Sequence, residues 1–205
     1  MTMKLYDGAL SGNAYKIRLF LSLLGLEHEL VPVDLRSGEN RTAGYLEKNP
    51  RGQIPVLEDG DVTIWDSQAI LVYLARRYAA EDWLPLQAGP MARVMQWLAV
   101  AENELLFGLA RARAVKKFGR DFDLDACQQY GIAGLRVLDG HLQKRDWLAG
   151  ERPTVADVAC FPYVALAPEG DISLDEYTAL PGWIDRVRSL PGFVGMEGIP
   201  GPNDA

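Results

Sequence analysis

The stretch "PRGQIPVLEDGDVTIWDSQAILVYL", residues 50–74, decides how the first part of this chain folds. Two short apolar runs, at residues 54–57 and 62–64, flank Asp59-Gly60. An Asp-Gly pair between two apolar runs is a strong signal for a β-hairpin. Residues 67–78 then carry apolar side chains at helical spacing. The stretch therefore predicts two antiparallel strands followed by a helix.

Upstream of this stretch, strand-like and helix-like runs alternate. Strands are predicted at residues 3–6 and 28–33, and helices at residues 15–24 and 43–48. Gly25 directly follows the first helix, in the position where a glycine commonly ends one. The order of elements is β-α-β-α-β-β-α. It predicts that the first two strands pair in parallel and the last two antiparallel.

Strand signals end at a segment with two prolines and a glycine, "LPLQAGP" at residues 84–90. We expect an α/β domain at residues 1–82, a linker at 83–90 and an all-helical domain at 91–205. Thr154-Val155-Ala156-Asp157 has the spacing of a capping box and marks the start of one helix. The helices expected in this domain cover residues 91–117, 123–143, 154–166 and about 181–189.

The composition disfavours several classes of protein. The chain has 205 residues and a formal net charge of −7, whereas nucleic-acid binders carry basic surfaces. No apolar run approaches the ~20 residues that span a bilayer, and the N-terminus lacks the apolar core of a secretion signal. Cys127 and Cys160 are too few for a disulfide framework. We expect two buried thiols in a cytoplasmic protein that binds no nucleic acid, membrane or metal.

Pro55 is unexpected inside a strand, because proline has no N–H to give to the ladder. A cis bond between Ile54 and Pro55 would turn the backbone of Ile54 outward. Its N–H and C=O would then be free to pair with an extended, peptide-like ligand. The alternative is that Pro55 begins an edge strand and binds nothing.

Asp66 and Ser67 stand just before the helix that follows the hairpin. The helix N-terminus and the Ser67 hydroxyl suit a carboxylate, and Asp66 suits an ammonium group, so that together they fit the head group of an amino acid. Gln53 adds an amide contact beside them. The alternative is a plain N-cap. Taken with Pro55, these residues describe a clamp for a short zwitterionic peptide.

A third candidate segment, "SGNAYK" at residues 11–16, lies between the first strand and the first helix. A helix N-terminus after a strand stabilises anions, and Ser11 and Asn13 offer a hydroxyl and an amide as donors. Either residue also serves as an ordinary helix cap. His28 and His141 are remote from this segment in sequence, which disfavours a serine nucleophile activated by histidine.

In their order along the chain, these segments resemble the cytosolic-type (bacterial) glutathione S-transferase family over nearly the full length. The resemblance implies a thioredoxin-like α/β N-terminal domain (βαβαββα) and an all-α C-terminal domain. Redox relatives of the fold carry Cys-x-x-Cys where this chain reads Ser-Gly-Asn-Ala, residues 11–14, so dithiol exchange is excluded there. The motifs that carry the resemblance are "LYDGALSGNAYKIRLFLSLLG", "NPRGQIPVLEDGD", "WDSQAILVYLARRY" and "LAGERPTVADVACFPYV".

The resemblance implies glutathione as co-substrate, bound by the first domain. Ile54 would pair with the cysteinyl backbone, Pro55 being cis, and Asp66 and Ser67 would hold the γ-glutamyl end. The residues implied near the glycyl carboxylate are Gln53, Asn40 and Arg51.

The glutathione sulfur would face a serine- or asparagine-type site, Ser11 or Asn13. Tyr15 and Tyr6 are rivals, of which Tyr6 is discounted as part of a strand. Lowering a thiol pKa from ~8.5 to about 6.5 takes roughly 3 kcal/mol. One hydrogen bond to the thiolate, about 1.5–3 kcal/mol, together with the helix N-terminus, up to ~2 kcal/mol, suffices. The thiolate then attacks an electrophile held close to it.

A small hydrophobic or electrophilic second substrate is expected between the domains, against the first helix of the helical domain. Arg111 and Arg113 are candidates there and would favour anionic acceptors; the alternative is a solvated helix face. Trp97 and Leu98 fit the core better than the cleft, and Phe107 is a further candidate. The resemblance also implies a homodimer.

The leading function is conjugation of glutathione to small electrophiles, with detoxification as its role. The alternative is glutathione-dependent disulfide or peroxide reduction. Asn13 keeps it open, because a glutathione sulfur exchanges without a protein cysteine. A second alternative is a non-catalytic binding or regulatory protein on the same scaffold, against which the presence of Pro55, Asp66 and Ser67 argues.

Overall fold

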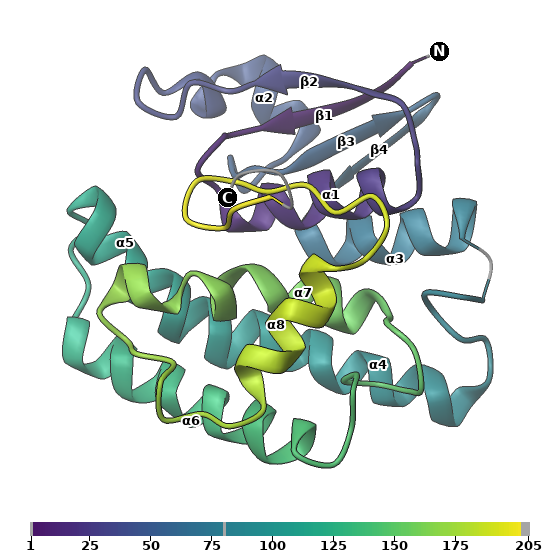
Figure 1. Cartoon of the computed structure of the whole chain (residues 1–205). Helices are drawn as coiled ribbons and strands as arrows, with labels where there is room; N and C mark the ends of the chain where they lie inside the picture. The colour runs from purple at the N-terminus through teal and green to yellow at the C-terminus, as the bar shows by residue number, and fades with distance from the viewer. Residues whose placement is uncertain (1, 80, 202–205) are drawn as a thin grey trace.

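A four-stranded mixed sheet forms one side of the molecule (Figure 1). The structure is a computed structural model and describes residues 2–79 and 81–201. β1 and β2 are parallel, whereas β3 pairs antiparallel with both β1 and β4, as the sequence predicts. The strands are β1 (Met3–Asp7), β2 (His28–Pro32), β3 (Val56–Asp59) and β4 (Val62–Trp65), in the order β2-β1-β3-β4.

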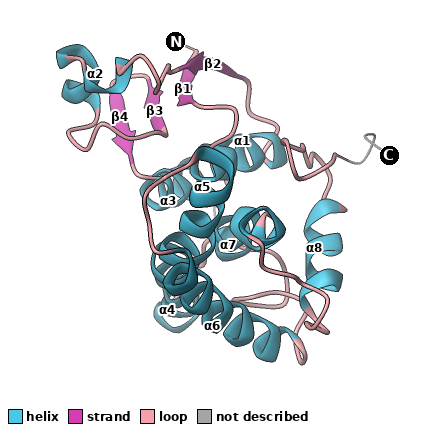
Figure 2. Ribbon diagram, turned by 90° about the vertical axis from the view of Figure 1, so that its left-hand side faces the viewer, coloured by secondary structure: helices cyan, strands magenta, loops and turns pink. Residues whose placement is uncertain are grey.

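Helices cover both faces of the sheet. α1 (Gly12–Leu23) and α3 (Ser67–Tyr78) lie on the face turned toward the rest of the chain, and α2 (Ala43–Lys48) lies on the other (Figure 2). Gly25 follows the C-cap of α1 with a φ of 64°, a left-handed conformation that glycine adopts without steric cost. These elements confirm the thioredoxin-like βαβαββα order.

The remaining chain is helical. Its elements are α4 (Ala88–Val100), a π-helical segment (Ala101–Ala110), α5 (Arg111–Phe118), α6 (Leu124–Leu142), α7 (Val155–Ala165) and α8 (Leu180–Arg188). α7 lies at the centre of this domain and packs against α1, α3 and α4. The expected capping box is present at its start, where the Asp157 carboxylate accepts from the Thr154 N–H at 2.9 Å. No helix in the described residues is both long and apolar enough to cross a membrane.

Several expected boundaries are wrong, among them the start of α1, which lies at Gly12 rather than at Tyr15. β3 begins at Val56 rather than at Ile54, because neither Ile54 nor Pro55 joins the ladder. α4 begins at Ala88, inside the expected linker; Pro90 is tolerated there because the first turn of a helix needs no N–H donors. The helix expected at 91–117 runs continuously from 88 to 118, with a π-helical middle that hydrophobic spacing does not reveal.

The C-terminal segment returns to the first domain and packs along α1 (Figure 1). The Tyr15 hydroxyl donates to the Val194 carbonyl at 2.7 Å, and the Ser22 hydroxyl donates to the Gly192 carbonyl at 2.7 Å. Buried side chains of both domains also form one continuous hydrophobic cluster. This cluster fixes the position of the loops that meet between the domains.

Candidate active site

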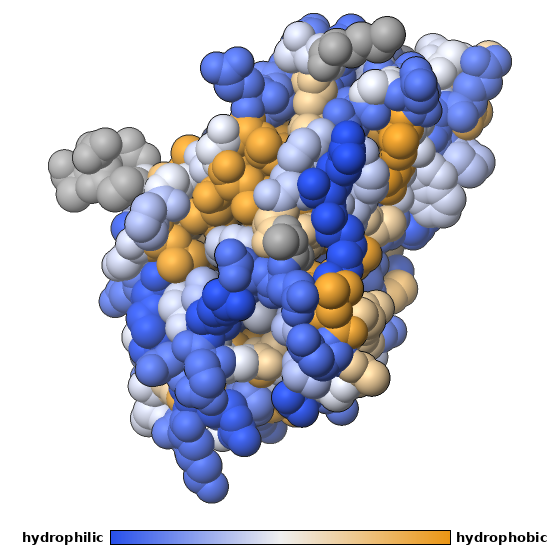
Figure 3. All heavy atoms as spheres, turned by 90° about the vertical axis from the view of Figure 1, so that its right-hand side faces the viewer, coloured by the Kyte–Doolittle hydropathy of each residue, from blue (hydrophilic) through white to orange (hydrophobic). Residues whose placement is uncertain are grey.

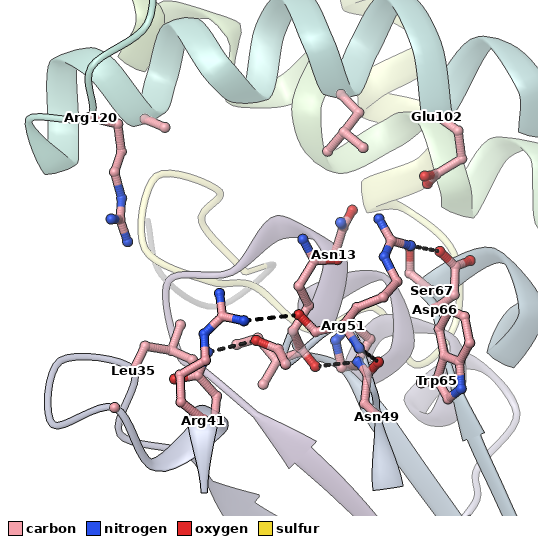
Figure 4. Close-up of a pocket in the computed structure, with 18 of the residues that line it drawn as sticks. Asn13, Leu35, Arg41, Asn49, Arg51, Trp65, Asp66, Ser67, Glu102 and Arg120 are labelled. Atoms are coloured by element: carbon pink, nitrogen blue, oxygen red, sulfur yellow. Dashed lines mark hydrogen bonds and ion pairs between the residues drawn. The ribbon is translucent and has the colours of Figure 1, made fainter. Parts of the chain in front are cut away.

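A cleft of about 680 Å³ opens where the two domains meet (Figure 4). Loops of the thioredoxin-like domain form its floor, and the π-helical segment and the end of α5 form the opposite wall. The floor brings together most residues that the sequence singles out. Those that line the cleft are Asn13, Asn40, Arg51, Gln53, Ile54, Pro55, Asp66 and Ser67.

The loop before β3 offers unpaired backbone groups to the cleft. The Ile54–Pro55 bond is cis. No hydrogen bond among the described residues uses the N–H or C=O of Ile54. The preceding carbonyl, of Gln53, is held by the Tyr45 hydroxyl at 2.9 Å and by Asn49 Nδ2 at 2.7 Å. A fixed loop therefore presents one donor and one acceptor that an extended ligand can use.

The N-terminus of α3 supplies the second part of the floor. Asp66 caps the helix: its Oδ1 accepts from the N–H of Gln68 at 3.0 Å, and its Oδ2 lies 3.3 Å from Arg51 Nη1. Asp66 has a φ of 79°, which costs about 1–3 kcal/mol for a non-glycine residue and commonly marks a functional site. Ser67 is 2% exposed, and its hydroxyl has no hydrogen-bond partner in the described chain. A buried hydroxyl at a helix N-terminus suits a carboxylate.

The N-terminus of α1 forms the middle of the cleft. The Ser11 hydroxyl caps the helix by accepting from the Ala14 N–H at 3.2 Å, and Ser11 does not line the cleft. Asn13 does line it. The Asn13 Oδ1 atom is buried without a partner, and Nδ2 forms no hydrogen bond within the described residues. Asn13 therefore points into the cleft with an unused amide, as Figure 4 shows.

Neither tyrosine rival reaches this position. The Tyr6 hydroxyl donates to Glu58 at 3.0 Å, within the sheet. Tyr15 is fully buried and donates to the Val194 carbonyl. Burial raises the Tyr15 pKa far above its ordinary value, despite the opposing charges of Arg18 and Arg188. Both hydroxyls are thus committed to the structure rather than to a ligand.

Charged groups stand at both ends of the cleft. Glu102, on the helical wall, accepts from Gln68 Nε2 at 2.8 Å and lies 3.9 Å from Lys16 Nζ. Lys16 is fully buried, and its burial lowers the Lys16 pKa although Glu102 opposes this effect. At the other end lie Arg41 and Arg120, which form no ion pair with the described residues. The Glu102 and Asp66 carboxylates thus have the cationic partners Lys16 and Arg51, whereas the two guanidinium groups at the other end have no anionic partner among the described residues.

Arg111 and Arg113 lie outside the cleft. Arg113 is 3% exposed; it forms an ion pair with Glu169 and donates to the Leu10 carbonyl. Arg111 stacks on the rings of Phe107 and Phe122, at 4.1 and 4.8 Å from their centroids. Neither arginine lines the cleft, although Arg111 lies against Phe122, which does. Trp97 and Leu98 belong to the core, as the sequence favours.

The sequence predicts that the first helix of the helical domain walls the cleft, but it does not identify the residues that line it. The wall residues Glu102, Leu106, Ala114, Arg120 and Phe122 come from the long helical segment and the loop after it. Gly119 is the sequence signal that points to Arg120. A glycine after a basic helical turn predicts a helix end, so that Arg120 leaves the helix axis. Among the described residues, no three His, Cys, Asp or Glu side chains gather as metal ligands do.

The chain was compared with known proteins. Residues 1–76 match the family "Glutathione S-transferase, N-terminal domain", and residues 113–191 match "Glutathione S-transferase, C-terminal domain". Glutathione S-transferase 3 of Zea mays is 34% identical, with 93% of this chain and 91% of that protein covered. The disulfide-bond oxidoreductase YfcG of Escherichia coli is 30% identical, with 87% of each chain covered. The crystal structure of a glutathione S-transferase from Pseudomonas fluorescens superposes with a TM-score of 0.90 at 34% identity, covering 96% of this chain and 99% of that one.

Proposed function

The chain belongs to the glutathione S-transferase family of enzymes, and we propose that it activates glutathione as a thiolate and conjugates it to small electrophiles. One observation carries this proposal. Ser67, the backbone of Ile54 and Asn13 lie on one floor, and each has hydrogen-bonding capacity that the described residues leave unused. Glutathione has a matching group for each of them: its γ-glutamyl carboxylate for Ser67, its cysteinyl backbone for Ile54 and its thiolate for Asn13.

We assign the sulfur contact to Asn13 rather than Ser11. The Asn13 amide lines the cleft, whereas Ser11, whose hydroxyl oxygen caps the helix, does not. The glycyl carboxylate then lies toward Asn40 and Arg41, and Gln53 contributes its exposed amide. The Asn13 donor and the N-terminus of α1 together supply the roughly 3 kcal/mol that thiolate formation at neutral pH requires.

Conjugation of 1-chloro-2,4-dinitrobenzene tests this function. We expect catalysed conjugation, and a KM for glutathione that rises about tenfold in Ser67→Ala, because one hydrogen bond to a carboxylate is lost. Ser189→Ala is the matched control, since Ser189 bonds only within its own helix end. Absence of glutathione binding in a thermal-shift assay, together with absence of conjugation, would refute the proposal.

Disulfide reduction is a second candidate, favoured by Asn13 and by the similarity to the YfcG oxidoreductase. The bound thiolate would attack a disulfide and release one thiol, and a second glutathione would release the other and leave as oxidised glutathione. Reduction of a small disulfide, measured beside conjugation, separates the two activities. A rate for the disulfide well above that for the chloroarene would favour reduction.

We also propose that the protein is a homodimer. Apolar side chains lie in patches among polar ones on the face that carries α3 and α4 (Figure 3). Met95 of α4 and Val137 of α6 are 48% and 55% exposed. Analytical ultracentrifugation of the wild type and of Met95→Glu tests this; a monomeric wild type would refute it.

A further inference from the structure

The helical wall of the cleft is apolar except at its two ends. Leu106 and Ala114 come from the long helical segment, and Phe122, which is 41% exposed, follows it. These side chains line the same cleft as Asn13. A ligand that fills the space above Asn13 therefore meets an apolar surface, which suits an aromatic or aliphatic group.

Arg120 interrupts this apolar wall. Gly119 ends α5 with a φ of 62°, and the Arg120 N–H then donates to the Ala114 carbonyl at 3.2 Å. This turn directs Arg120 into the cleft, on the side of Leu35 and Arg41 and away from Asp66 (Figure 4). Within the described chain, its guanidinium has no carboxylate partner. Arg120 is thus an exposed cation that lines the cleft without a counter-ion among the described residues.

The charges of glutathione do not account for Arg120. If glutathione lies as proposed, the α3 N-terminus and Ser67 hold one carboxylate, and Arg41 with Asn40 holds the other. The Asp66 and Glu102 carboxylates, on the side of the cleft away from Arg120, suit the ammonium group. Arg120 projects from the opposite wall, where the second substrate lies. A guanidinium without a counter-ion beside an apolar surface selects a ligand that combines an apolar body with an anionic group.

We propose that the second substrate of this enzyme is an apolar electrophile bearing a carboxylate, and that Arg120 binds that carboxylate. This inference rests on the proposed function. With 4-chloro-3-nitrobenzoate as acceptor, the glutathione thiolate forms a carbon–sulfur bond at the chlorinated ring carbon. Chloride then leaves with the electron pair of the carbon–chlorine bond, and the thiol proton passes to solvent. The carboxylate takes no part in these steps and serves only for binding.

Two acceptors that differ only in charge test the assignment: 4-chloro-3-nitrobenzoate and 4-chloro-3-nitrobenzamide, each rate being divided by its uncatalysed rate. We expect the wild type to prefer the benzoate about tenfold or more in kcat/KM. Arg120→Gln abolishes the preference, and Arg120→Lys keeps part of it. Lys116→Gln is the control. It removes the same charge four residues away, at a side chain that pairs with Asp171 outside the cleft.

Three kinetic results would overturn the assignment. The first is a wild type without preference for the benzoate, and the second is a preference that Arg120→Gln leaves intact. The third is a rise in the KM for glutathione with both acceptors in Arg120→Gln, which would place Arg120 on glutathione instead. Calorimetric titration of 3-nitrobenzoate into protein saturated with S-methylglutathione tests Arg120 without turnover. Binding that Arg120→Gln weakens supports the assignment even if conjugation itself fails, and binding that it leaves unchanged refutes it.

Discussion

Arg113 of α5 donates a hydrogen bond from Nη1 to the Leu10 carbonyl at 2.8 Å and so ties the helical domain to the turn that begins α1. The guanidinium is almost fully buried, and Glu169 accepts from its Nε. Burial favours the protonated form of Glu169, but hydrogen bonds from Lys117 and Arg113 outweigh it and hold the Glu169 pKa below its usual value. Arg113 is thus part of the support of the cleft, although it does not line it.

Replacing Arg113 with Met tests this support. We expect the free energy of unfolding to fall by about 2–3 kcal/mol, because the Leu10 carbonyl and one side of Glu169 lose charged donors. Glu169 keeps Lys117, which limits the loss. Arg113→Lys should lose less, because it keeps the charge. Urea unfolding measures the change, and an unfolding midpoint of Arg113→Met equal to that of the wild type would contradict it.

Local signals account for what the sequence predicts well. The Asp59-Gly60 hairpin, the helix after Asp66 and the capping box at Thr154 each depend on residues within a few positions, and all three are present. The role of Arg113 depends on Glu169, 56 positions away. A basic residue on a helix is usually solvated, so nothing local distinguishes a buried arginine from an exposed one.

The cleft also combines features that depend on neighbouring residues with features that depend on distant ones. Its floor is predictable, because Ile54, Asp66 and Asn13 lie at local features: a proline beside a strand and the starts of two helices. The residues of its opposite wall are not predictable, because which face of the 88–118 segment meets the cleft depends on how that segment packs against α6 and α7. The π-helical turns also shift the side-chain spacing away from the period on which a sequence reading depends.

Lys16 and Glu102 form an ion pair. The stability that is lost when this pair is broken should depend on pH. Glu102→Gln leaves the fully buried Lys16 ammonium without its counter-charge. We expect a destabilisation of about 2–4 kcal/mol at neutral pH. The folded-state pKa of Lys16 lies below 10.5, so the cost of burying its charge is present at low pH and is relieved as the pH rises. The difference between wild type and variant should therefore shrink toward pH ~10.

A second substitution isolates the buried charge. Lys16→Met in the Glu102→Gln background removes the ammonium, and stability at neutral pH should be largely restored. Urea unfolding of the two single variants and the double variant, at several pH values, measures the coupling between Lys16 and Glu102. Additive single effects would show that the two residues do not interact.

Gly12 leaves room for the Tyr163 ring at the start of α1. A Cβ on Gly12 would lie 2.6 Å from Tyr163 Cε1, closer than real contacts allow, and the ring is buried. We expect Gly12→Ala to destabilise the protein by about 1–3 kcal/mol and to weaken glutathione binding, since Asn13 follows directly. Gly44→Ala is the matched control. It adds a methyl group in α2 where nothing lies within 4 Å, and it should be neutral or stabilising. Thermal-shift assays with and without glutathione measure both effects. A Gly12→Ala variant that melts at the same temperature as Gly44→Ala and is stabilised equally by glutathione would contradict the expectation.

Ser11 and Asn13 are neighbours at one helix start, but they should respond to truncation in opposite ways. Ser11→Ala removes the hydroxyl that accepts from Ala14, so the protein should lose about 0.5–2 kcal/mol of stability. Asn13→Ala removes no hydrogen bond within the described residues, so stability should change by less than about 0.5 kcal/mol. The pKa of the bound glutathione thiol, followed by the ultraviolet absorbance of its thiolate, should rise by about 1–2 units in Asn13→Ala and stay constant in Ser11→Ala. A rise in Ser11→Ala with none in Asn13→Ala would move the sulfur contact to Ser11.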